Sequence, residues 1–203
     1  MKNPLALLSL LTVILTAGSL QAQSLLKNGD FSSGLDGWNT SNISGPATPG
    51  AILKVEALPD AGGKSGKSAR ITDEDDKAGI SLRQNVPAEA GKVYTLTFMS
   101  KTTVPEGQKG TPGYAMIQFL DAKGTYLNNP DAPTATGTPT PEERKLIKRD
   151  ACNFATPGKD WQAGTLTATA PAGTTRMWVL FKAGNGQRGI TDVSDVSIAP
   201  ATP

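Results

Sequence analysis

The sequence predicts an all-β protein in which two antiparallel sheets pack face to face as a jelly-roll β-sandwich. Three observations support this fold class. Glycine and proline, with 22 and 15 residues, occur throughout the chain and separate short apolar stretches. Within these stretches apolar and polar residues often alternate, as in a strand with one face in the core and one in water. Threonine, which favours strands, is frequent between the turns.

The first element along the chain is an export signal. Lys2 is followed by an almost unbroken apolar run from Leu5 to Leu15. Small residues follow at Ala17, Gly18 and Ser19, and Ala22 offers a small residue for cleavage. This layout is typical of a secretory signal peptide, which we assign to residues 1–22. The run is short for a membrane span, although an uncleaved N-terminal anchor is the alternative. We therefore expect a protein that is secreted, periplasmic or on the cell surface.

The remaining residues, 23–203, have the length of one domain, and we expect it to be a monomer. They contain no second apolar stretch that could span a membrane after removal of the signal. The whole chain has 20 Lys and Arg against 18 Asp and Glu. Because this charge is nearly balanced, the composition gives no indication of a nucleic-acid partner.

Eight stretches of the mature chain are predicted strands. The clearest is 93–101, where Tyr94 and Phe98 fall on the same face because side chains alternate with a period of two. The stretches 52–57 and 68–71 alternate less clearly and are weaker candidates. The complete series is 52–57, 68–71, 80–86, 93–101, 114–120, 161–170, 176–182 and 191–198.

The segment 128–153 interrupts this series. Its first part is rich in proline and threonine, which predicts an open loop. Thr140, Pro141 and Glu143 then match the cap, the first position and the third position of a short helix. We interpret 128–153 as an insertion between two strands, and such segments are either functional or disordered.

Two scarce residue types restrict the chemistry. Histidine is absent, which excludes Ser-His-Asp and Cys-His nucleophiles and His-ligated zinc or copper sites. The single cysteine, Cys152, cannot form an internal disulfide. A buried apolar role fits it better than a reactive thiol. Catalysis would therefore have to use carboxylates, lysine or tyrosine.

One dense acidic run, Asp73–Asp76, raises the possibility of a carboxylate pair for glycoside hydrolysis. However, adjacent residues on a loop point in different directions, and such runs are usually solvated turns. The sequence around the run also lacks the apolar context that would raise the pKa of one carboxyl. We therefore predict a solvated turn.

Five segments, taken in order, carry a resemblance to a known family. They are LLKNGDFSSGLDGW (25–38), AGKVYTLTF (90–98), IQFLDAKGTYL (117–127), WQAGTLTATAPAGTT (161–175) and ITDVSDVSI (190–198). Together they resemble the carbohydrate-binding modules of families four, nine and twenty-two, which have a galactose-binding-like jelly roll. The resemblance covers nearly the whole mature chain except the insertion. It implies binding of a β-glucan, a xylan or a related polysaccharide.

The resemblance also implies roles for aromatic residues. Trp38 follows the turn at Gly37, and the equivalent aromatic of the family mainly fills the core. Phe31 and Tyr94 fall at similar structural positions, and we assign both to the core.

Members of the family often hold a structural calcium where the first strand meets the last. This implies Asp30 and Asp195 as carboxylate ligands, because calcium prefers oxygen donors. Ser32 and Ser194 occupy positions that are usually acidic in the family, so the set of ligands is incomplete in sequence. The alternative is that Asp30 and Asp195 only cap turns.

Sugar binding needs flat aromatic faces flanked by amide and guanidinium groups. In this fold the usual site is the concave face of one sheet. If Met177 and Val179 point inward, alternation directs Trp178 to the opposite face, and the same reasoning applies to neighbouring strands. We predict Trp178 as the stacking platform and Tyr114 as a second aromatic contact, unless both pack under the insertion. The predicted hydrogen-bonding partners are Arg83, Asn85, Gln118 and Arg176.

These observations predict a non-catalytic, exported module that binds a polysaccharide or a glycoconjugate. A structural or interaction protein of the cell surface, built on the same scaffold, is the alternative if the insertion fills the concave face. A third possibility is a hydrolase acting on glycosyl bonds, or an accessory to one. The absence of histidine and of a convincing carboxylate pair argues against catalysis.

Overall fold

A computed structural model describes residues 23–59, 65–104, 113–128, 150–153, 158, 160–183 and 188–201. The predictions of a signal peptide at 1–22 and of a helix beginning near Thr140 lie outside these residues, as does the side chain of Cys152. Within the described ranges, the structure contains no helix of the length and apolar character that a membrane span requires.

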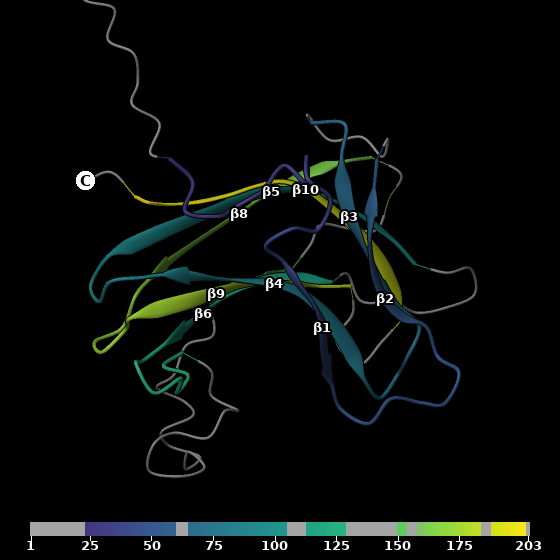
Figure 1. Cartoon of the computed structure of the whole chain (residues 1–203), viewed down its shortest axis with the longest axis horizontal. Helices are drawn as coiled ribbons and strands as arrows, with labels where there is room; N and C mark the ends of the chain where they lie inside the picture. Colours follow the sequence, from purple (N-terminus) through teal and green to yellow (C-terminus); the bar gives the residue numbers. More distant parts are fainter. Residues whose placement is uncertain are drawn as a thin grey trace, which may run out of the picture.

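The described residues form ten strands in two five-stranded antiparallel sheets that are stacked face to face (Figure 1). The predicted β-sandwich is therefore confirmed. The first sheet, called here the site sheet, has the strand order β1-β4-β9-β6-β7. Its strands are Asn39–Ser44 (β1), Gly79–Pro87 (β4), Arg176–Lys182 (β9), Tyr114–Leu120 (β6) and Asp150–Asn153 (β7).

The second sheet, called here the back sheet, has the strand order β2-β3-β10-β5-β8. In both sheets most neighbouring strands are distant in sequence, so the chain crosses repeatedly from one layer to the other. The strands of the back sheet are Leu53–Leu58 (β2), Ser68–Asp73 (β3), Gly189–Pro200 (β10), Val93–Thr103 (β5) and Gln162–Thr169 (β8).

The start of the described chain lies against its last strand, as Figure 1 shows. The amide of Leu25 donates to the carbonyl of Ile198 at 2.8 Å, and the amide of Val196 donates to the carbonyl of Gly29, also at 2.8 Å. A Cβ atom at position 29 would lie only 2.0 Å from the Val196 oxygen, so this approach requires glycine. We call this junction the terminal seam.

An aromatic cluster fills the core between the sheets. The ring of Trp38 stacks on Phe31 at 5.4 Å between centroids and also packs against Phe181 at 6.2 Å. Phe98 meets the same Phe181 ring edge-on at 5.3 Å. Trp38, Phe31 and Tyr94 are all buried, which confirms their predicted places in the core.

The acidic run 73–76 is a correction to the sequence prediction, because two of its members are not solvated. Asp73 and Asp75 are each only 1% exposed. Asp75 accepts hydrogen bonds from the backbone amides of Thr48 and Lys77, and these donors lower its pKa to about 2. The carboxylate of Asp75 therefore ties two loops together.

Asp73 has the opposite environment. It is the last residue of β3, with Leu53 of β2 on one side and Gly189 of β10 on the other. One carboxylate oxygen accepts the Asp75 amide at 3.1 Å, whereas the other is buried with no hydrogen-bond partner among the described residues. Burial raises the pKa of Asp73 to about 6. The apolar context missing from the local sequence is thus supplied by packing between strands.

The segment 128–153 is described only at its two ends, and both are attached to the site sheet. The side chain of Asn128 accepts the Phe119 amide of β6 at 2.8 Å and donates to the Asp150 carboxylate at 2.9 Å. Residues 150–153 form strand β7, which pairs with β6 along the edge of the sheet. The last four residues of the predicted insertion therefore belong to the sandwich. Their short sequence, D-A-C-N, shows no strand-like alternation.

Candidate functional site

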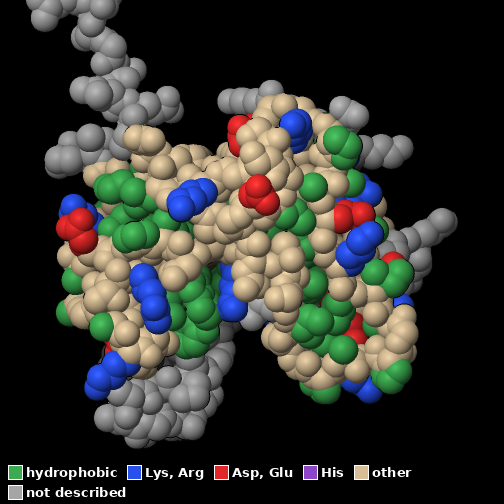
Figure 2. All heavy atoms as spheres, in the orientation of Figure 1, with side chains coloured by type: hydrophobic (Ala, Val, Ile, Leu, Met, Phe, Trp, Pro, Cys, Tyr) green, Lys and Arg blue, Asp and Glu red, His purple; other side chains and the backbone are tan. Residues whose placement is uncertain are grey.

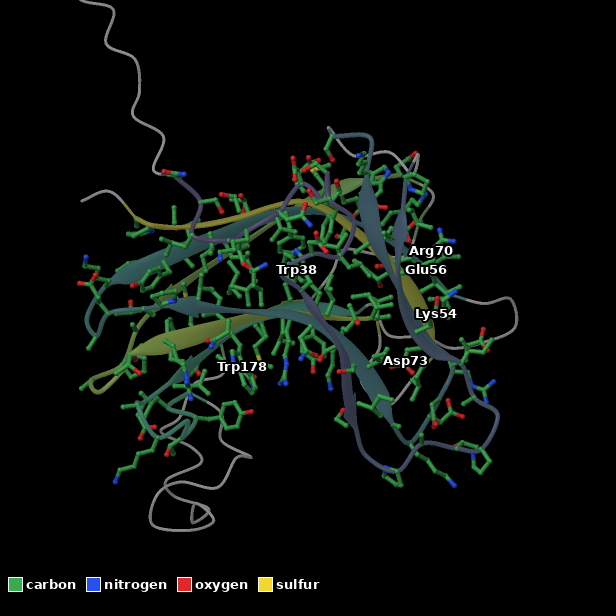
Figure 3. All side chains as sticks on the ribbon, in the orientation of Figure 1. Trp38, Lys54, Glu56, Arg70, Asp73 and Trp178 are labelled. Carbon is green, nitrogen blue, oxygen red and sulfur yellow. The ribbon has the colours of Figure 1, made fainter. Side chains whose placement is uncertain are left out.

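The faces predicted for β9 are confirmed. Met177, Val179 and Phe181 are buried in the core, so Arg176 and Trp178 point to the outer face of the site sheet. Figure 3 shows Trp178 projecting from β9 away from the back sheet, whereas Trp38 lies between the two layers. The outer face is the part of the site sheet that could meet a ligand. The space-filling view shows the molecule hollowed below this sheet, with Lys and Arg side chains at the border (Figure 2).

Strand register brings five of the six predicted ligand contacts together. Asn85 of β4 and Gln118 of β6 lie directly on either side of Trp178 in one cross-strand row. Arg83 belongs to the next row on one side, and Arg176 belongs to the next row on the other. The side chains of three adjacent rows therefore converge around one indole ring.

These neighbours differ in how much of them a ligand could reach. Asn85 is exposed, whereas Gln118 is only 7% exposed and offers little of its amide to solvent. Met116 and Leu180, in the row that contains Arg83, are buried although they point to the outer face. The open part of this face therefore consists of Trp178 and the β4 side of the sheet.

Arg83 covers the indole of Trp178. Its guanidinium carbon lies 4.0 Å from the ring centroid, which is the geometry of a cation–π contact worth about 0.5–1 kcal/mol at a partly exposed site. Stacking uses the flat face of the guanidinium and leaves the N–H groups at its edge available. No described residue accepts a hydrogen bond from this guanidinium.

The aromatic partner of Trp178 is Tyr126, which the sequence analysis missed. The two rings meet edge-on with their centroids 5.4 Å apart. Burial raises the pKa of Tyr126, and the positive charge of Arg83 opposes that rise. Tyr114, the predicted second aromatic, instead pairs with Lys182. Lys182 lies four residues from Trp178, which is about 13 Å along the strand.

A tight turn delivers Tyr126 to this position. The carboxylate of Asp121 accepts the amides of Lys123 at 2.9 Å and Thr125 at 2.8 Å, and these hydrogen bonds lower its pKa. The chain then folds back so that Tyr126 bridges to Leu120 at the end of β6. The turn residues D-A-K-G after a strand are the sequence signal that could have located Tyr126.

A groove of about 580 Å³ opens beside Trp178, along the edge of β4. It forms because the pairing of β1 with β4 begins at Asn39 and Arg83, so the stretch of β4 beyond Arg83 has no strand on that side. The side-chain amide of Gln84 exchanges two hydrogen bonds with the backbone of Lys27, at 2.7 and 2.9 Å, and fixes the opposite wall. The lining residues are Leu25, Lys27, Gly37, Asn39, Arg83, Gln84, Asn85, Val86, Pro87 and Trp178.

Several solved structures match this chain over most of its length, although their sequences are less than 20% identical to it. The enzymatically active domain of bacteriophage CBA120 tailspike protein 4 matches with a TM-score of 0.61 at 19% identity, over 88% of this chain and 21% of that one. This chain therefore spans about a fifth of the length of that phage protein. No protein-family model matches the sequence, and neither does any curated protein.

Two further structures are carbohydrate-binding modules of comparable size. The CBM22-1 xylan-binding domain of Paenibacillus barcinonensis Xyn10C matches with a TM-score of 0.55 at 12% identity, over 90% of this chain and 97% of that one. TmCBM61, solved in complex with β-1,4-galactotriose, matches with a TM-score of 0.52 at 14% identity, over 89% and 100%. This chain shares its β-sandwich fold with these two modules. At this level of identity the likeness concerns the fold alone.

The predicted calcium site, with Asp30 and Asp195 as carboxylate ligands, would lie at the terminal seam. Asp30 accepts the amide of Ser32 at 3.1 Å, which lowers its pKa, and Asp195 accepts the amide of Ser65 at 3.2 Å. Among the described residues no group of three or more acidic, cysteine or histidine side chains could hold a metal ion. Beyond these two carboxylates, backbone or side-chain carbonyls and water would have to complete the six to eight oxygens that calcium takes. Calcium at the seam stays a prediction.

Proposed function

We propose that this protein is an exported, non-catalytic module that binds glycan chains on the outer face of its site sheet. The observation that carries the proposal is the convergence of Trp178, Tyr126, Arg83 and Asn85 beside an open groove. An aromatic ring with nearby amide and guanidinium donors is the combination that recognises a pyranose, which has apolar C–H faces and a rim of hydroxyl groups.

Recognition would combine stacking with hydrogen bonding. The part of the Trp178 ring that Arg83 leaves uncovered would contact the sugar C–H groups. The exposed amide of Asn85 would donate to and accept from hydroxyl groups in the same row. The Tyr126 ring, held against Trp178, limits how far the indole can rotate and so keeps this surface in place before the ligand arrives.

The comparisons support a glycan partner. One similar domain is described as xylan-binding, and another was solved with a β-1,4-linked galactotriose. The absence of histidine from the chain also favours binding over catalysis, because it removes the most common general base. A reducing-sugar assay with the polymers that bind should detect no new chain ends.

Affinity electrophoresis tests the binding. Wild-type mature protein should be retarded by at least one polymer from a panel of glucans, xylans, galactans and uronic-acid polymers. Trp178→Ala should remove the retardation. Trp161→Ala is the matched control, because Trp161 is also a partly buried tryptophan but stands beside Lys101 on the back sheet. Retardation by no polymer, or equal retardation of both variants, would contradict the proposal.

A further inference from the structure

We infer that the groove selects glycans that carry carboxylate groups, that is, polymers containing uronic acids. This inference rests on the proposed function and narrows its ligand class. Two independent features of the site sheet support it: the distribution of charge over its outer face, and the way in which Arg83 is stacked.

Among the residues that the structure describes, the charged side chains on the outer face of the site sheet are all positive. The alternation of β4, β9 and β6 places Arg83, Arg176 and Lys182 on this face and places no described Asp or Glu there. Lys27, on the opposite wall, adds an exposed cation to the groove, whose lining includes no acidic residue. Because the whole chain is nearly neutral, with 20 basic and 18 acidic residues, this face is a local concentration of positive charge.

The acidic residue closest in sequence to this face is engaged elsewhere. Asp121 directly follows β6, but its carboxylate accepts the amides of its own turn at Lys123 and Thr125. It is therefore held by the turn that positions Tyr126. The two cations that line the groove, Arg83 and Lys27, are left to act on whatever enters it.

The stacking of Arg83 argues against a purely neutral ligand. At 4.0 Å the guanidinium occupies a face of Trp178 that a neutral pyranose would otherwise use as its platform. A guanidinium stacked on an aromatic ring keeps the N–H groups at its edge available for hydrogen bonds. A planar fork of this kind matches the two oxygens of a carboxylate and forms paired, charge-assisted hydrogen bonds with it.

Geometry thus assigns separate tasks to the two side chains. The uncovered part of the indole contacts the sugar ring, and the edge of the guanidinium binds the carboxylate at C5 of the same or the next sugar. The exposed side chain of Lys27 adds a second, less directional attraction from the other wall of the groove.

The test compares each acidic polymer with its own carboxyl-reduced form. Polygalacturonate, alginate and glucuronoxylan are each titrated against the wild-type mature protein, alongside the reduced polymers, in which only the carboxylates have become alcohols. At least one acidic polymer should bind about tenfold or more tightly than its reduced form, as expected for a charge-assisted pair. Salt at about 0.5 M should weaken binding of the acidic form only.

Three variants locate the effect. Arg83→Gln should lose about tenfold of the preference for the acidic polymer, since it keeps the side-chain stem but removes the fork. Lys27→Gln should lose about threefold, and its fold is secure because only backbone atoms of Lys27 bind Gln84. Lys92→Gln is a charge-matched control in an exposed ion pair with Glu89, in the turn between β4 and β5, and it should bind like the wild type.

The outcomes separate the inference from the proposed function. Equal binding of a carboxylated polymer and its reduced form, or an unchanged preference in Arg83→Gln, would overturn the inference and leave glycan binding intact. Failure of every polymer, acidic or neutral, to bind would remove the proposed function and the inference together.

Discussion

Replacing Asp73 by asparagine should stabilise the protein at neutral and alkaline pH. The carboxyl is 1% exposed, and burial raises its pKa to about 6 from an ordinary value of 3.8. Because the folded-state pKa is the higher one, the folded chain binds the proton more tightly than the unfolded chain. The carboxyl therefore opposes folding least below about pH 4 and most above about pH 6, where it is charged in both states.

The size of the effect follows from the two pKa values. Their difference corresponds to about 3 kcal/mol of unfolding free energy once the pH lies well above 6. Asp73→Asn keeps an oxygen that can accept the Asp75 amide and removes the buried charge. We expect the variant to be more stable than wild type by up to about 3 kcal/mol near pH 8, and by little near pH 4.

Urea unfolding followed by tryptophan fluorescence at several pH values measures this difference. Asp75→Asn, from the same acidic run 73–76, is the control, because this substitution should lower the stability of the protein at neutral pH. Amide donors lower the pKa of Asp75 to about 2, so its charge stabilises the fold above about pH 4 and that stabilisation is lost as the pH falls toward 2. A variant Asp73→Asn that is less stable than wild type near pH 8, or equally shifted at both pH values, would refute the reasoning.

Three further predictions concern other parts of the sandwich. Gly164→Ala should destabilise the fold by about 1–3 kcal/mol in urea unfolding, because the new Cβ would lie 2.2 Å from the Phe98 ring; an unchanged midpoint would show that the ring moves freely. Asp192→Asn should cost about 2–3 kcal/mol, since Asp192 is 2% exposed and holds Arg70 through two hydrogen bonds of 2.7 and 2.9 Å; a loss below about 0.5 kcal/mol would contradict this. Calcium bound at the terminal seam would raise the Tm in CaCl₂, an increase that EDTA and Asp195→Asn should both remove, whereas identical melts would exclude it.

Alternation is a local property of the chain, and it allowed the faces of the site sheet to be predicted. The period of two in β9 was enough to direct Trp178 outward, and the same period in β4 and β6 correctly placed Arg83, Asn85 and Gln118 on that face. The core positions of Trp38, Phe31 and Tyr94 were predicted from a different source, the resemblance to a known family, and the structure confirms them.

The register between neighbouring strands depends on residues that are distant in sequence. The sequence therefore did not predict which aromatic side chain lies beside Trp178. Tyr114 and Tyr126 are both aromatic residues near β6, but register separates the first from Trp178 and a turn brings the second to it. The burial of Asp73 depends on strands β2 and β10, which come from opposite ends of the chain. Strand β7 is an edge strand of four residues, too short to carry a period.

The wall of the groove opposite Trp178 has a mechanical consequence. Leu25 and Lys27 belong to the segment that is anchored on one side to the last strand and on the other to Gln84. A molecule bound between Trp178 and this wall would contact the segment that forms the terminal seam and would hold that segment in place. Filling the groove should consequently slow hydrogen–deuterium exchange at the Val196 amide, which lies in the other layer and touches no ligand.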